Sequence, residues 1–132
     1  MALMTWNAEQ YATNVAFIDE ENKVLFDLLN EVYALAIDGA ERAEIGVALD
    51  ALIAHAIKHF AHEEQEMEAA AYADYANHKM QHDLLIGMCS GLQKKFHAGE
   101  GEINAMVGQM VKNWLDSHIP TFDKAYGSSL NA

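Results

Sequence analysis

Proline is nearly absent from this chain, which leaves almost all of it free to form long helices. The 132 residues contain a single proline, Pro120. Proline lacks a backbone donor and clashes with the preceding helical turn, so its scarcity permits long uninterrupted helices. The length suits one domain with a sizeable hydrophobic core, and we expect residues 1–132 to form that single domain.

Four stretches of the chain carry apolar residues in steps of three and four, the period of a helix with one buried face. Short connections join them, so the sequence predicts an all-α fold, an up-down-up-down four-helix bundle. Residues 1–17 lack this period and are predicted to form an N-terminal arm, anchored by Trp6 and Phe17. Asp19 is expected to cap the first helix and Gly39 to end it. The helices are expected near residues 19–38, 41–70, 74–97 and 103–118.

The buried face of each predicted helix is apolar with a few exceptions. On the first helix the period places Asn22 between Ile18 and Leu25, where a buried amide is unusual. The apolar positions expected on the four faces are Leu29, Val32 and Ala36; Ile45, Leu49, Leu52, Ala56, Met67 and Ala70; Leu85, Cys89, Leu92 and Phe96; and Ile103, Val107, Met110 and Trp114.

Histidines and a carboxylate occupy the remaining positions of these faces. His59 and Glu63 lie one turn apart on the second helix, and His78 and His82 lie one turn apart on the third, so each pair points in one direction. His118 is the last position of the fourth face. A hydrogen-bonded core histidine would explain any one of them alone. Because burying charges without partners costs several kcal/mol each, the whole set on facing helices predicts a metal site of the di-iron type.

Spacing alone does not place Asp123 in this layer. Asp123 follows His118 by five residues, which on an ideal α-helix turns it about 140° away. Pro120 lies between them and disfavours a continuous helix. A break or kink at Pro120 is the expected way for Asp123 to turn back toward His118.

Charge and composition exclude several function classes. The formal net charge is −12 with only eight Lys and Arg residues, which argues against nucleic acid and against anionic membranes. No apolar run approaches the length of a transmembrane helix, and the first residues lack the pattern of a secretory signal. The one cysteine, Cys89, excludes an internal disulfide and is expected to be a buried packing residue. A cytoplasmic location is expected.

In sequence, this set of motifs resembles the hemerythrin family, specifically the single-domain bacterial hemerythrins. The similar pieces occur in the family's order and spacing across nearly the whole chain: the Trp6 arm, IDEEN at residues 18–22, HFAHEE at 59–64 with Met67 and Tyr72 after it, HKMQH at 78–82, and WLDSHIPTFDKAY at 114–126. The combination of H-x3-E, H-x3-H and H-x4-D is far more specific than any of its parts.

The resemblance implies a non-heme di-iron centre bridged by an oxo or hydroxo group and two carboxylates. It also implies an open coordination position on the second iron, where dioxygen binds. The second iron would take His59, together with a first-helix histidine that the family supplies. By position, the implied ligands of the first iron are His78, His82 and His118, and the bridging residues are Glu63 and Asp123.

Asn22 stands where the family places that first-helix histidine. An amide oxygen is a weak neutral donor, so Asn22 is expected either to bind weakly or to leave a gap that water fills. His55 and His62 are minor alternatives, since they lie about 80° and about 100° off the buried face of the second helix, and Glu66 lies about 60° off. The second iron is therefore expected to be weakened and more open, to take exogenous ligands readily and to oxidise faster.

The leading function is dioxygen binding, as a carrier, store or sensor, with peroxide, azide or nitric oxide as other small ligands and with a redox partner that the sequence does not identify. A peroxidase or oxidase that uses the open iron is the first alternative. A metal-binding protein that fills only the three-histidine site is the second. The acidic residues Glu20, Glu21, Glu64 and Glu66 are expected to be a solvated surface, and Trp114 and Tyr126 to pack in the core or to contact the ligands.

Overall fold

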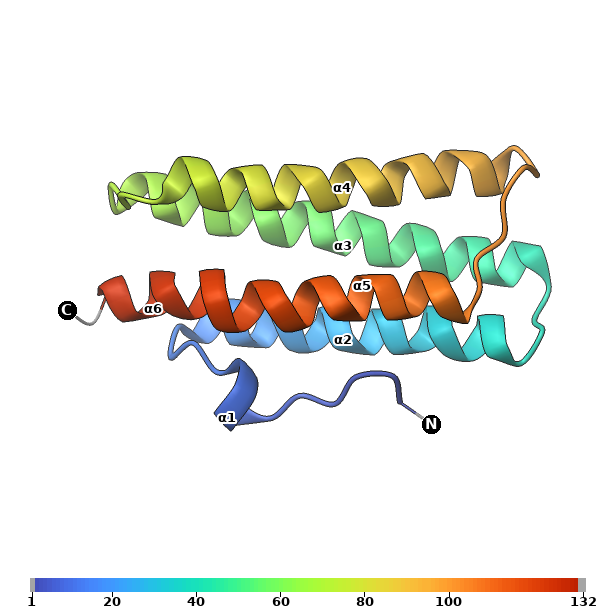
Figure 1. Ribbon diagram of the computed structural model, residues 1–132, viewed down its shortest axis with the longest axis horizontal. Coiled ribbons are helices and arrows are strands. Elements are labelled where there is room, and N and C mark those ends of the chain that lie inside the picture. The colour runs from blue at the N-terminus through green and yellow to red at the C-terminus, as the bar shows by residue number, and fades with distance from the viewer. Residues whose placement is uncertain (1, 131–132) are drawn as a thin grey trace.

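The structure is a computed structural model that describes residues 2–130, so the first residue of the predicted arm and the last two residues of the predicted domain lie outside it. Four long helices run antiparallel to their neighbours in an up-down-up-down bundle (Figure 1), which confirms the predicted all-α architecture. The elements are α1 (Ala8–Tyr11), α2 (Ala16–Ile37), α3 (Arg42–Ala69), α4 (Tyr75–His97), α5 (Ala105–His118), the π-helical turn η1 (Ile119–Asp123) and α6 (Lys124–Leu130).

Three of the long helices end in the same way, with one residue in the left-handed conformation. Gly39 ends α2 with φ of 70° and Gly99 ends α4 with φ of 78°. At the end of α3 the same place is taken by Ala71, with φ of 53°, and the amide of Tyr72 donates to the carbonyl of Met67 at 3.0 Å. This closure satisfies helix-end carbonyls without glycine, which is why the sequence between α3 and α4 shows no glycine at its turn.

Apolar side chains fill the bundle along most of the predicted faces. Met67 is completely buried and Phe96 is 4% exposed, but Ala70 is exposed, because α3 ends one residue before it. The prediction for the last long helix is partly wrong. Its buried strip consists of Gly108, Val111, Leu115 and His118, whereas Val107, Met110 and Trp114 are half-buried.

The N-terminal arm crosses the α2 and α5 side of the bundle and contains the short helix α1 (Figure 1). Trp6 is half-buried and packs against the core, with the Lys23 ammonium 4.4 Å from its ring centroid. Asp19 does not cap α2, which begins at Ala16. The Asp19 carboxylate instead accepts hydrogen bonds from the amide and the hydroxyl of Thr13, at 2.9 and 2.7 Å, and so ties the arm to α2.

The last helix continues past Pro120 without a break. Pro120 cannot donate to the carbonyl of Asp116, and the chain widens there into the π-helical turn η1, closed by a bond from the Lys124 amide to the Ile119 carbonyl. Of the expected break or kink, the break does not occur, and Asp123 turns back toward His118 through the π-helical turn. In an i→i+5 turn the side chains of His118 and Asp123 share one face, and the two meet in the bundle core.

None of the helices within residues 2–130 combines the length and the apolar character that crossing a membrane requires.

Candidate metal centre

Six ionisable side chains meet at one level of the bundle, and all of them are buried. Helix α3 supplies His59 and Glu63, α4 supplies His78 and His82, and the last helix supplies His118 and Asp123. Their exposed fractions lie between 0% and 3%. The structure thus brings together all six residues that the sequence singled out.

The Nε2 atoms of three histidines converge on one point. The His78 Nε2 atom lies 2.6 Å from Glu63 Oε1 and 3.1 Å from Asp123 Oδ1. The His118 Nε2 atom lies 3.1 Å from the same Asp123 oxygen and 3.2 Å from His82 Nε2. One donor atom from each of these five side chains falls within 4.8 Å of all the others. Such a cluster of imidazole nitrogens and carboxylate oxygens has the composition of an iron or zinc site.

Each carboxylate in the cluster faces two ways. Oε1 of Glu63 and Oδ1 of Asp123 point to the three histidines. The other Glu63 oxygen, Oε2, lies 3.2 Å from His59 Nε2, and the other Asp123 oxygen, Oδ2, lies 3.2 Å from the Asn22 amide nitrogen. Each of the two carboxylates thus divides its oxygens between two neighbouring positions.

Several buried polar atoms at this level make no hydrogen bond within the described chain. They are His59 Nε2, both carboxylate oxygens of Glu63, and the Nδ1 atoms of His78 and His118. Glu63 and His59 approach closely without hydrogen-bond geometry. Buried polar atoms without hydrogen bonds are costly, and coordination to cations would satisfy the carboxylate and Nε2 atoms, so the residues present fit a metal centre.

The charges of the site are coupled. Burial alone would lower the pKa of His59, but the close contact with the negatively charged Glu63 carboxylate outweighs it and raises that pKa to about 9. Burial also opposes protonation of His78, but its hydrogen bond to Asp123 and its close contact with the Glu63 carboxylate raise its pKa to about 9. Burial would raise the pKa of Glu63, but three imidazoles hold it well below its usual range. Without metal, two imidazolium groups thus offset the buried negative charge.

The whole bundle matches known proteins. The family model described as Hemerythrin HHE cation binding domain matches residues 13–127. The chain belongs to the hemerythrin family. It is 51% identical to the bacteriohemerythrin of Methylococcus capsulatus over 132 residues, all of both chains, and 33% identical to the hemerythrin of Themiste dyscrita over 116 residues, 88% of this chain and 85% of the relative. A crystal structure of a wild-type hemerythrin superposes with a TM-score of 0.95 and 50% identity, covering 99% of this chain and all of that one.

Aromatic rings hold two of the histidines of the centre in place. The His118 ring stacks on Trp114, with centroids 4.2 Å apart, and on Phe122, with centroids 5.3 Å apart. The His82 ring stacks on Phe60 at 4.0 Å with nearly parallel planes. Trp114 is therefore a neighbour of the centre as well as a packing residue. Rings packed in this way limit the rotation of the imidazoles and orient their Nε2 atoms.

Asn22 lies at the centre, as its position in the helical period predicts. Its side chain is 1% exposed, and its Nδ2 atom donates to Asp123 Oδ2. The amide thus faces the half of the site that holds His59. His55 and His62 do not reach this half. The Nε2 atom of His55 lies 3.0 Å from the backbone carbonyl of Glu21, and the Nδ1 atom of His62 lies 2.8 Å from the Glu21 carboxylate.

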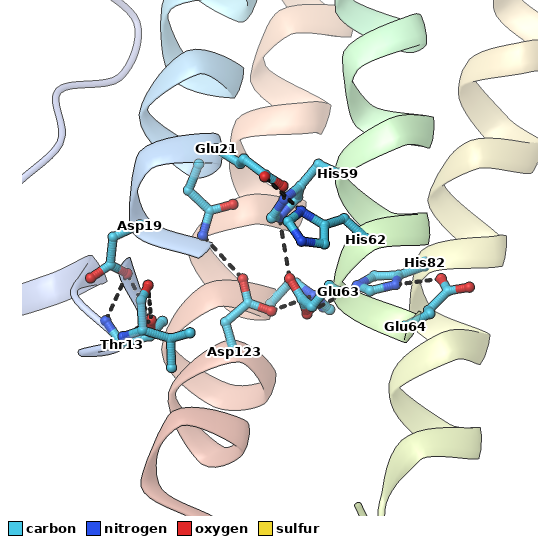
Figure 2. Close-up of polar contacts among 12 residues, drawn as sticks. Thr13, Asp19, Glu21, His59, His62, Glu63, Glu64, His82 and Asp123 are labelled. Atoms are coloured by element: carbon cyan, nitrogen blue, oxygen red, sulfur yellow. Dashed lines mark hydrogen bonds and ion pairs between the residues drawn. The ribbon is translucent and has the colours of Figure 1, made fainter. Parts of the chain in front are cut away.

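Glu21 is a member of the site that the sequence reading missed. It was expected on a solvated surface, but its Oε1 atom accepts from His59 Nδ1 at 2.7 Å and its Oε2 atom from His62 Nδ1 at 2.8 Å (Figure 2). The carboxylate lies between the two rings and links α2 to α3. A carboxylate on Nδ1 fixes which nitrogen of His59 carries the proton and leaves Nε2 free to coordinate.

Glu64 has the same relation to the other half of the centre. Its Oε2 atom lies 2.8 Å from Nδ1 of His82, on the side of the ring away from Glu63 (Figure 2). The expectation of a solvated Glu64 is therefore also wrong, because only 17% of its side chain is exposed. Glu20 and Glu66 are exposed, as expected of surface residues.

Proposed function

We propose that this chain binds dioxygen at a di-iron centre. His78, His82 and His118 would hold one iron, Glu63 and Asp123 would bridge, and His59 would hold the second, with an oxo or hydroxo group as the remaining bridge. The observation that carries the proposal is the division of both carboxylates between the two halves of the site. Iron bound there supplies reversible redox chemistry and an open coordination position for a small ligand.

The surroundings of the centre suit a small apolar ligand. An apolar cavity of about 20 Å³ lies one helical turn from both halves of the centre, lined in part by Leu25 and Ala56 on one side and by Leu85 and Leu115 on the other. That volume accommodates about one small molecule. Apolar walls keep bulk water away, while the Asn22 amide is placed to hydrogen-bond a ligand or a water in the gap where an imidazole would otherwise bind.

A metal-binding role with one filled site is the second candidate. The five clustered donors belong to Glu63, Asp123 and the three histidines His78, His82 and His118, and His59 lies outside that cluster. The Asn22 amide already donates a hydrogen bond to Oδ2 of Asp123, the oxygen that would bind a second metal ion. A protein that fills only the three-histidine position would bind about one metal ion per chain.

A cytoplasmic location, which the single cysteine and the composition suggest, is part of the proposal.

Three measurements on the iron-loaded protein test the proposal. We expect about two irons per chain, and a new absorption band when the anaerobically reduced protein meets dioxygen, which fades as the protein oxidises. A ratio near one iron per chain would support the metal-binding candidate. Sustained turnover of peroxide with a generic reductant would support the peroxidase alternative, whereas dioxygen binding without turnover supports the leading proposal.

A further inference from the structure

The outer face of α4 carries an apolar stripe that nothing in the described chain covers. Met80, Leu84 and Met88 follow one another in steps of four and are 52%, 56% and 45% exposed. Gly87 and Gly91 lie on the same face, and a Cβ atom added to either would meet nothing within 4 Å. By helical rotation this stripe lies about 140° from the buried face of α4. Large apolar and small residues therefore alternate along an open helix surface.

The apolar stripe lies away from the metal centre and from the N-terminal arm. Helix α4 runs along the edge of the bundle opposite the N-terminal arm (Figure 1). Its ligand-bearing face, with His78 and His82, points inward. On the flank of the stripe, the Lys79 ammonium and the Asp83 carboxylate pair at 2.9 Å, so the flank presents little net charge. A partner could dock here without touching the metal centre.

The order of large and small residues fits a second copy of the same helix. When two copies of α4 pack antiparallel about a twofold axis between Leu84 and Gly87, Leu84 faces the second copy's Gly87. The next pair along the axis is then Met80 against the second copy's Gly91. Each glycine receives a large apolar side chain, and the relation holds in both directions, as a twofold interface requires. Glycines also let two helices approach closely.

The charges at the two ends of α4 favour the same antiparallel arrangement. Asp74 precedes the first turn, and Lys94 and Lys95 lie in the last turn, all three exposed. Antiparallel packing brings Asp74 of one copy near Lys94 and Lys95 of the other at both ends. Parallel packing would place like charges together. We infer that this chain forms an antiparallel homodimer through Met80, Leu84, Gly87, Met88 and Gly91 of α4.

Such a dimer is expected to be weak. One helix from each copy gives an interface at the small end of specific complexes, and two chains of net charge −12 repel each other at a distance. Added salt screens that repulsion while leaving the apolar contact intact. Association should therefore strengthen with protein concentration and with moderate salt.

Sedimentation equilibrium of the iron-loaded chain tests the inference, at protein concentrations from about 10 µM to about 1 mM, where small interfaces associate. The average mass should rise toward that of a dimer. Leu84→Lys and Gly87→Leu should each weaken dimerisation at least about tenfold, because one places charge in the stripe and the other fills a recess. Val47→Lys is the matched control, since Val47 is a 72% exposed apolar residue on α3.

A wild-type chain that stays monomeric throughout this range would overturn the inference. So would a dimer that Val47→Lys weakens and the two α4 variants do not, because the interface would then lie elsewhere. The helical content and iron content of every variant should equal those of the wild type, since all three positions are exposed and none lies on a buried helix face that carries the metal-centre residues.

Discussion

The Asn22 amide nitrogen lies 3.2 Å from Oδ2 of Asp123, in a layer where both side chains are 1% exposed. The amide therefore holds the carboxylate oxygen that faces the His59 half of the centre. An imidazole at position 22 would offer a strong nitrogen donor to a second iron, whereas the amide offers a hydrogen bond to Asp123 and a weak oxygen donor. The contact between Asn22 and Asp123 therefore makes the groups that can bind a metal differ between the two halves of the centre.

Asn22→His should strengthen the second half. We expect iron affinity at that half to rise at least about tenfold, or about 1.4 kcal/mol, and oxidation of the dioxygen-exposed protein to slow. Ferrous titration and the decay rate of the dioxygen-dependent absorption band measure the two effects. Asn22→Leu, which has the same branching and number of heavy atoms but no polar group, serves as the control, and it should neither raise the iron affinity nor slow the oxidation. Unchanged affinity and unchanged decay in Asn22→His would show that Asn22 does not face the second iron.

Glu21→Gln should lower the iron affinity of the His59 half by a different mechanism. The amide cannot fix His59 as the carboxylate does, and loss of such an outer partner typically costs about 10- to 100-fold in metal affinity. The neighbouring Glu20→Gln removes the same charge from a residue whose side chain is 73% exposed and, within residues 2–130, forms an ion pair only with Lys23. Iron retained per chain after dialysis should fall in Glu21→Gln and not in Glu20→Gln. Equal losses in both variants would mean that charge alone matters.

The metal-free protein should lose stability as the pH rises through the range of its buried histidines. The pKa values of His59 and His78 stand at about 9 in the fold, above the ordinary value of about 6.5. Their contribution is therefore fully present below about pH 6.5 and is lost between about pH 6.5 and pH 9.

Urea unfolding of the iron-free chain across that pH range measures this loss. Glu63→Gln removes the carboxylate that raises the pKa of His59, and it should flatten the slope. A stability that is constant from about pH 6.5 to pH 9 in the wild type would contradict the coupling.

Cys89 should react slowly with alkylating reagents at neutral pH. Burial raises the pKa of its thiol to about 11, and the thiolate is the reactive form. The rate should climb by about tenfold per pH unit until the pH approaches that value. An exposed thiol, made by Ser128→Cys in a Cys89→Ala background, gives the reference rate. Cys89 is half-buried rather than fully buried, and equal rates for the two thiols at neutral pH would show that the packing around it does not shield the thiol.

Periodicity predicted the positions that depend on helical geometry alone. A helix repeats its faces every three or four residues, so Asn22, His59 and His82 could be assigned to the interior without coordinates. The last long helix departs from this rule. Its buried strip lies one residue from the predicted one, because the half-buried Met110 and Trp114 are as apolar as the buried Val111 and Leu115.

Features that depend on contacts between helices were not predictable from the period. Glu21 and Glu64 lie off the buried faces of their own helices, and their roles arise only where a histidine of the neighbouring helix comes within 2.8 Å. One signal was present in the sequence: His59 and His62 are three residues apart, so a single carboxylate from α2 can reach both. Asp123 reaches the centre only through the π-helical turn. Apart from Pro120 and the H-x4-D spacing, no residue pattern predicted that turn.

Anaerobic titration of the iron-free chain with ferrous iron tests the two unequal halves of the centre most directly. We expect two binding steps, a tight one for the three-histidine half and a weaker one for the half with His59 and Asn22, and we expect Asn22→His to bring the second step close to the first. A single step that ends at one iron per chain, or two steps of equal affinity in the wild type, would contradict the proposed centre.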